Sequence, residues 1–256
     1  MPPVPTALTH AADRPGTSMP MNPPAVATIT WARTAAEEAL LRRSLQALAR
    51  IGWPVAVADA GTNSAFAEFL DSLPSFSVTT PSERGLVAQV KASVALAATF
   101  ATPFVLYSEP DKHRFFDEGL RDFVRLAGES RGGGELGVAL AARSAGSFET
   151  YPPMQRYTEG VINDLCGAFV GRKGDYSYGP FIMSRALLPR IATLPYDLGW
   201  GWRHAVFHAA HRAGLRVEHV IDDYPCPPDQ RVEDDAERTH RLRQLSDNIR
   251  GLITEP

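Results

Sequence analysis

The sequence has few cysteines and no long apolar run. Its two cysteines, Cys166 and Cys226, lie 60 positions apart and form no Cys-x-x-Cys pair. This spacing is typical of reduced thiols and excludes a disulfide-stapled scaffold. The longest uncharged apolar stretch, residues 92–107, is shorter than the roughly 20 residues of a membrane span, and Pro103 interrupts it. No transmembrane segment is therefore predicted.

A basic tract is also missing. Lysine and arginine number 26 against 29 acidic residues, so the net charge is −3. Because binding to polymeric nucleic acid requires clustered basic side chains, DNA and RNA are not expected partners. The N-terminus lacks the basic patch and apolar run of a secretory signal, and we expect a cytoplasmic protein.

The composition is that of an ordinary globular protein. Hydrophobic residues make up 44% and charged residues 21% of 256 positions. Residues 1–24 contain seven of the 21 prolines and little apolar periodicity, which predicts a flexible tail. Residues 25–256 are expected to form one α/β domain. Its first half, 25–112, would bind a nucleotide, and its second half, 113–256, would form the acceptor pocket.

Short apolar runs alternate with helical patterns along the first half. The pattern predicts strands at 26–31, 54–58, 76–80 and 103–107, with helices at 35–51, about 62–70 and 85–99 between them. Strands that are apolar on both faces favour a mostly parallel sheet covered by helices on both sides. In the second half we expect helices at 114–128, 157–169, 185–193, 201–213 and 234–252, and strands or extended segments at 136–141, 178–184 and 217–222.

Acidic residues follow two of the predicted strands. Asp59 ends the second strand, and Glu109 and Asp111 follow the fourth. Ligands of open α/β sheets bind beyond the carboxyl ends of the strands. Two carboxylates one residue apart in an extended segment point to the same side, where both could face a divalent cation and a diphosphate. A solvated acidic turn is the alternative for Glu109 and Asp111, and a turn-forming role is the alternative for Asp59.

Four segments in order resemble the GT-A glycosyltransferases, of the kind grouped in family 2. They are residues 55–62, the acid-x-acid motif Glu109-Pro110-Asp111, residues 177–185 around Gly179, and Thr239-His240-Arg241-Leu242. The last is similar to the His-Arg of the mannosylglycerate and glucosyl-phosphoglycerate synthase groups. The resemblance runs from about residue 25 to 252 and implies a GT-A fold.

The resemblance implies transfer of a hexose from a nucleotide-diphosphate sugar to a hydroxyl of a small molecule or glycan. Asp111, Glu109 and His240 would bind Mn²⁺ or Mg²⁺, and mixed oxygen and nitrogen ligation suits Mn²⁺ better. Asp59 and Gly179 would lie near a UDP- or GDP-sugar donor. Arg84, Lys91, Lys112 and Arg241 are candidate phosphate neighbours, although exposed basic residues are mostly solvated.

The residues do not identify a catalytic base. Inverting relatives carry a Glu-Asp pair in this region, where this sequence has Gly-Trp or Trp-Arg around Trp200 and Trp202. Either Asp197 or His204 would act as the base, or the reaction retains the anomeric configuration and needs none. The glycerate-modifying relatives imply a charged acceptor, which Arg172, Lys173, Arg185 and Arg203 would suit.

Other interpretations remain open. His204, His208 and His211 fall on one helical face, a spacing that could bind zinc, but the flanking residues are typical of a core. A sugar-phosphate nucleotidyltransferase would carry a glycine-rich basic loop after the first strand, where this sequence has Ala32-Arg33-Thr34-Ala35. A non-catalytic nucleotide- or sugar-binding protein on the same scaffold is the alternative outside enzymes.

Overall fold

The structure is a computed structural model that describes residues 22–129 and 133–254. The predicted flexible tail lies outside the described residues except for residues 22–24. Within the described residues, no helix combines the length and apolar character needed to cross a membrane. Cys166 and Cys226 are both free, as the sequence predicted, and the structure shows that both are buried.

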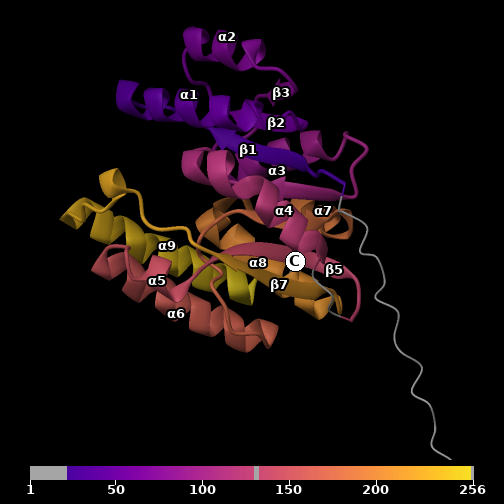
Figure 1. The fold of residues 1–256 in the computed structure, drawn as a ribbon, viewed down its shortest axis with the longest axis vertical. Coiled ribbons are helices and arrows are strands. Elements are labelled where there is room, and N and C mark those ends of the chain that lie inside the picture. The colour runs from indigo at the N-terminus through magenta and orange to yellow at the C-terminus, as the bar shows by residue number, and fades with distance from the viewer. Residues whose placement is uncertain (1–21, 130–132, 255–256) are drawn as a thin grey trace, which may run out of the picture.

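One seven-stranded sheet forms the centre of the described chain (Figure 1). Its strand order is β3-β2-β1-β4-β6-β5-β7. Neighbours pair in parallel except β6, which is antiparallel to both β4 and β5. The predicted mostly parallel sheet is therefore confirmed. The strands are β1 (Ala25–Thr30), β2 (Val55–Asp59), β3 (Phe76–Thr79), β4 (Phe104–Tyr107), β5 (Leu136–Arg143), β6 (Phe181–Ser184) and β7 (Arg216–Asp222).

Helices cover both faces of the sheet, and Figure 1 shows α1 and α2 at the opposite end of the molecule from α6 and α9. The α-helices are α1 (Ala35–Ala49), α2 (Ser64–Ser72), α3 (Leu86–Ala97), α4 (Leu120–Glu129), α5 (Ala145–Phe148), α6 (Pro153–Val170), α7 (Leu188–Thr193), α8 (Trp202–Arg212) and α9 (Asp235–Ile253). One π-helical turn, η1, spans Phe115–Gly119. Three 3-10 helices of the described chain are η2 (Arg185–Leu187), η3 (Tyr196–Gly201) and η4 (Pro228–Gln230). Each helix predicted from the sequence is present, with α6 beginning four residues earlier than expected because Pro153 starts it.

Two hydrophobic cores lie on the two faces. Because side chains alternate along a strand, Ala25 and Ala27 of β1 enter one core while Val26 enters the other. The first core contains buried residues of α3, α6, α7, α8 and the end of α9. The second contains those of α1, α2, η1 and α4. Burial on both faces explains why the strands read as continuous apolar runs.

The direction of β6 brings two distant segments together. Tyr107, the last residue of β4, pairs with Phe181, the first residue of antiparallel β6. The residues that follow β4 therefore lie beside those that precede β6. Since β5 is in turn antiparallel to β6, it runs in the same direction as β4 and ends at the same edge of the sheet.

The last helix is held close to the sheet by two glycines. A β-carbon added to Gly201 would overlap the backbone of α9, and one added to Gly251 would overlap the backbone of Gly201. This close approach, with Leu252 buried in the first core, fixes α9 against η3 and α8. Asp234 caps the helix by accepting a hydrogen bond from the Glu237 N–H.

Candidate functional site

A pocket of about 440 Å³ lies at the edge of the sheet where β4, β5 and β7 end. This size is in the range of small-molecule sites. Its walls come from the segment after β4, from α6, from the loop before β6, from the start of α8, from the segment after β7 and from α9. The lining includes Glu109–Phe115, Arg143, Tyr151, Gln155, Glu159, Ser177, Tyr178, Trp200, Arg203, Asp222–Pro225, His240, Arg241 and Gln244.

Glu109 is fixed in one orientation by two neighbours. Oε1 accepts a hydrogen bond from Nη1 of Arg203 at 3.0 Å, and both side chains are buried. On the other side, Gly179 has a φ of +128°, and a β-carbon there would overlap the Glu109 carboxylate. Only glycine both adopts this conformation readily and leaves room for the acid. Oε2 of Glu109 is buried without a hydrogen-bond partner.

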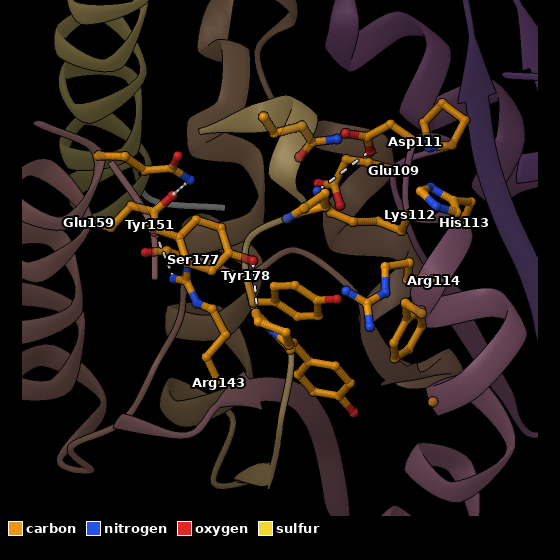
Figure 2. Close-up of a pocket in the computed structure, with 18 of the residues that line it drawn as sticks. Glu109, Asp111, Lys112, His113, Arg114, Arg143, Tyr151, Glu159, Ser177 and Tyr178 are labelled. Carbon is orange, nitrogen blue, oxygen red and sulfur yellow. Dashed lines mark hydrogen bonds and ion pairs between the residues drawn. The ribbon is translucent and has the colours of Figure 1, made fainter. Parts of the chain in front are cut away.

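Asp111 lies beside Glu109 in the same end of the pocket, as Figure 2 shows. The ammonium of Lys112 is 3.5 Å from Oδ1 of Asp111, which has no hydrogen-bond donor. Burial alone would lower the pKa of Lys112, but the charges of Asp111 and Glu109 outweigh it and raise that pKa above its ordinary value. Each acid thus faces a cation yet keeps a buried oxygen without a hydrogen bond.

Oε2 of Glu109 and Oδ1 of Asp111, neither of which accepts a hydrogen bond, fit a divalent cation. Carboxylate oxygens are the ligands that Mg²⁺ and Mn²⁺ prefer, and buried polar atoms normally have a partner. His240 and Arg241 line the same pocket from α9, with the side chain of His240 exposed. In the part of the chain that the structure describes, no three His, Cys, Asp or Glu side chains lie close enough together to hold a metal ion. The three-residue set predicted from the sequence is thus brought into one pocket but not assembled into a site.

A second cluster lies at the other end of the pocket, around Arg143 (Figure 2). Nε and Nη2 of Arg143 donate to the two oxygens of Asp175 at 2.7 and 2.9 Å, and Nη2 is also 2.7 Å from Oε2 of Glu159. Aromatic rings cover the guanidinium, with its carbon 4.5 Å from the centre of the Tyr151 ring and 5.8 Å from that of Tyr178. The bond to Arg143 helps to keep the pKa of Asp175 below its ordinary value despite the desolvation of its carboxylate by burial.

Three predicted donor contacts lie outside the lining of this pocket. Asp59 accepts four hydrogen bonds, from the hydroxyls of Thr30 and Thr62 and from the N–H groups of Gly61 and Thr62. These bonds match the turn-forming alternative. The ammonium of Lys91 lies 4.0 Å from the centre of the Tyr196 ring. Arg84 is exposed in the loop before α3. Two other residues predicted to lie near the donor, Lys112 and Arg241, do line the pocket. A third, Gly179, lies against the carboxylate of Glu109.

The positions of Asp197 and His204 correct the prediction that either is the catalytic base. Asp197 is on the surface, where its Oδ2 accepts a hydrogen bond from Arg250 at 2.8 Å. His204 is completely buried beside Phe207, and burial holds its pKa well below the ordinary value. Neither side chain lines the pocket, because the helical turn at the start of α8 points Arg203 into the pocket instead.

Three of the four basic residues predicted to suit a charged acceptor are bound to other groups of the chain. Arg185 donates to the backbone carbonyls of residues 98, 100 and 102. Arg172 pairs with Glu218 at 2.7 Å, and Arg203 pairs with Glu109. Among these four predicted residues, only Arg203 lines the pocket, and Lys173 lines a separate surface hollow with Arg172.

Sequence reasoning missed the cluster around Arg143. The sequence did contain a signal for Arg143, which is a charged residue at the end of an apolar strand. Glu109 was found from the same kind of position, shortly after an apolar strand. Tyr151 and Glu159 gave no comparable signal, since neither lies directly after a strand. In the loop after β1, the guanidinium of Arg33 donates hydrogen bonds to Glu37.

Comparisons with known proteins place the fold. The sequence matches no protein-family model and no curated protein. Among solved structures, glucosyl-3-phosphoglycerate synthase from Mycobacterium tuberculosis has 17% identity and a TM-score of 0.58, with 91% of this chain and 82% of that chain covered. Its complex with Mn²⁺ and UDP-glucose has 15% identity and a TM-score of 0.57, covering 91% and 79%. Its complex with Mn²⁺, UDP-glucose and phosphoglyceric acid has 16% identity and a TM-score of 0.55, covering 91% and 80%. At such identities the likeness concerns the fold: the chain has the GT-A-like fold of these glycosyltransferases.

Proposed function

We propose that this protein is a metal-dependent glycosyltransferase that moves a hexose from a nucleotide-diphosphate sugar to a hydroxyl acceptor. One observation carries the proposal. Glu109 and Asp111 follow a central strand of a GT-A-like sheet, line a pocket of about 440 Å³ and each keep a buried oxygen without a hydrogen-bond donor. The solved enzyme of similar fold binds Mn²⁺ and UDP-glucose, which favours Mn²⁺ and a UDP-sugar here.

The proposed reaction makes one bond and breaks one. The acceptor oxygen forms a bond to the anomeric carbon of the sugar, and the bond from that carbon to the diphosphate oxygen breaks. The nucleoside diphosphate leaves with the electron pair, and in the net reaction the hydroxyl proton is released to solvent. The departing diphosphate is the group that gains charge and therefore the one that the site must stabilise.

This chain supplies both ligands and cations for that purpose. Asp111 and Glu109 would bind the metal, with His240 as a third ligand from α9. A bound Mn²⁺ would neutralise charge on the diphosphate. Lys112 and Arg241 line the same pocket and present positive charge to its contents. Arg203 and Gly179 position Glu109, whose Oε1 is bonded to Arg203 and whose Oε2 would be the oxygen available to the metal.

Binding of the donor nucleotide tests the proposal directly. Calorimetry with UDP and with GDP, each with and without Mn²⁺, should show metal-dependent binding of at least one nucleotide. We expect Asp111→Asn to lower that affinity by at least about tenfold, because it removes a ligand charge while keeping the side-chain volume. Asp197→Asn is the matched control, since Asp197 is an acid on the surface outside the pocket.

Turnover separates an enzyme from a binding protein. A panel of nucleotide sugars should give Mn²⁺-dependent release of nucleoside diphosphate from one donor. Binding that is independent of metal and unchanged in Asp111→Asn would instead support a non-catalytic nucleotide- or sugar-binding protein. The absence of binding and of release across UDP, GDP, ADP and dTDP compounds would contradict the proposal. A cytoplasmic location stays a prediction that fractionation of cells would test.

A further inference from the structure

At the end of the pocket that faces away from Glu109 and Asp111, each basic side chain is paired with an acid. Every arginine and lysine in the lining has a carboxylate of the same chain within 4 Å, so at the end away from the proposed metal no unpaired cation faces the acceptor. The pairs are Lys112 with Asp111, Arg114 with Glu118, Arg143 with Asp175 and Glu159, Arg203 with Glu109, and Arg241 with Glu237.

Arg143 shows this most clearly, because it faces two buried acids. Asp175 takes both Nε and Nη2, the pair of donors that would otherwise grip a phosphate or carboxylate, and Glu159 also contacts Nη2. The rings of Phe148 and Tyr151 lie over the guanidinium, with its carbon 4.7 and 4.5 Å from the ring centres. Arg241 also approaches Glu159, at 4.0 Å, and is itself paired with Glu237, so around this end of the pocket three carboxylates contact two guanidiniums and negative charge is in excess.

The rim above Arg143 adds further acids. Asp222 ends β7 and Asp223 follows it, and both acids line the pocket and are exposed. The hydrogen bonds they accept come from neutral donors. The N–H of Asp223 donates to Asp222, and the hydroxyls of Ser144 and Ser147 donate to Asp223. A phosphorylated or carboxylated acceptor would therefore enter against like charge, which costs free energy when water is displaced.

Neutral polar and aromatic groups make up much of the remaining wall. Tyr178 stacks on Tyr224, with ring centres 4.6 Å apart and planes 8° apart, and both line the pocket with Tyr151. The amides of Gln155 and Gln244 and the hydroxyl of Ser177 are there as well. Flat aromatic faces beside neutral donors and acceptors suit a sugar or polyol, which presents C–H faces and hydroxyl edges.

From this arrangement we infer that the acceptor is an uncharged polyhydroxylated molecule, a sugar or polyol, rather than a phosphorylated or carboxylated one. The inference rests on the proposed glycosyltransferase function and specifies its second substrate. It also distinguishes this protein from the solved enzyme of similar fold, whose complex contains phosphoglyceric acid.

Matched acceptor pairs test the inference. Glucose is compared with glucose 6-phosphate, and glycerol with glycerate and with 3-phosphoglycerate, as accelerators of Mn²⁺-dependent UDP release from the best donor. We expect at least one uncharged compound to accelerate release, and to do so at least about tenfold more than its anionic counterpart. Greater acceleration by the anionic member of a pair, or none by any uncharged compound, would overturn the inference.

A binding experiment provides a readout that does not depend on turnover. Calorimetry with 3-phosphoglycerate on the protein loaded with Mn²⁺ and UDP should show at most weak binding to the wild type, which sets a lower limit on its Kd. Glu159→Gln removes one of the two acids that face Arg143 and should raise that affinity at least about tenfold. Glu149→Gln, which removes an exposed partner of Arg156, is the control. Equal 3-phosphoglycerate affinity for the wild type and Glu159→Gln would contradict the inference.

Two further measurements keep the outcomes separate. If Glu159→Gln does not fold by circular dichroism, the exposed double variant Asp222→Asn and Asp223→Asn replaces it, with the same expected gain. Binding of UDP with Mn²⁺ is measured first in every sample. Loss of that binding in the wild type would contradict the proposed function, whereas intact donor binding with a preference for anionic acceptors would contradict only the inference about the acceptor.

Discussion

Arg203 donates a hydrogen bond to Glu109 across 3.0 Å, and the two side chains are only 4% and 10% exposed. They lie 94 positions apart in the sequence. Glu109 follows a strand and Arg203 belongs to the first turn of α8, so the pair joins the sheet to the helix layer. Removing one partner of such a pair leaves the other charge buried and uncompensated.

Arg203→Met should therefore lower the free energy of unfolding by about 3–5 kcal/mol, measured by urea denaturation. The double variant Arg203→Met with Glu109→Gln removes both charges and should recover part of that loss. A change of less than about 0.5 kcal/mol in the single variant would show that the pair does not hold the two layers together.

Gly179→Ala should weaken metal-dependent UDP binding while the fold is retained. A β-carbon at Gly179 would overlap the carboxylate of Glu109 and would also require an unfavourable backbone conformation at a φ of +128°. We expect at least a tenfold loss of affinity by calorimetry. Gly214→Ala is the control, because its φ is +72° but nothing lies within 4 Å of the added carbon. Equal losses in both variants would mean that backbone strain, not displacement of Glu109, is responsible.

His240→Ala should lower the affinity for Mn²⁺, measured in the presence of UDP, by about tenfold if His240 completes the metal site. The matched control is His211→Ala, an exposed histidine on α8 that does not line the pocket. An unchanged Mn²⁺ affinity in His240→Ala would show that the two carboxylates and the diphosphate bind the metal without this side chain.

Stability should decline in mild acid because His204 is buried and His219 is partly buried. Desolvation by burial lowers the pKa of His204 well below its ordinary value of 6.5 and is the largest cause of the fall in the pKa of His219 to about 4. As the pH falls below about 6.5, the unfolded chain binds protons that the folded chain does not, so stability that is present at neutral pH is lost. The free energy of unfolding should fall by up to about 1.4 kcal/mol per pH unit for each histidine.

His204→Leu should make this decline shallower. Neither ring nitrogen of His204 has a hydrogen-bond partner, so the apolar residue removes both a proton-binding group and two unsatisfied polar atoms. Urea denaturation at several pH values between 7 and 5 measures the effect. Nucleotide release should persist in this variant because His204 does not line the pocket. Complete loss of release in a folded His204→Leu would restore the catalytic role expected from the sequence.

Periodicity predicted the elements of this fold well, because the apolar patterns reflect burial directly. The alternation of Val26 with its neighbours between the two cores is the physical origin of the strand pattern in β1. The apolar pattern did not indicate that β6 runs antiparallel to its neighbours in the sheet. A four-residue strand that is buried on both faces reads the same in either direction, and its pairing depends on contacts with β4 and β5.

The candidate site was only partly predictable. Glu109 and Asp111 could be found from their position after a buried strand. The roles of Asp197, His204 and Arg203 depend instead on the rotation of the helical turn at 196–203, where Gly199 adopts a φ of +56° and breaks the regular period. The packing of this turn on α9 determines which of its residues enters the pocket. The residues that make these packing contacts lie 40 to 50 positions away in the sequence.

The contact between Gly201 and Gly251 has a consequence for how acceptor range could change over evolution or in the laboratory. No side chain separates the two backbones, so a single methyl group at either position would push α9 away from Gly201 and η3. His240 and Arg241 would move with the helix although neither had been altered. Remote substitutions at these two positions offer a way to widen the entrance for larger glycans without replacing any side chain of the pocket.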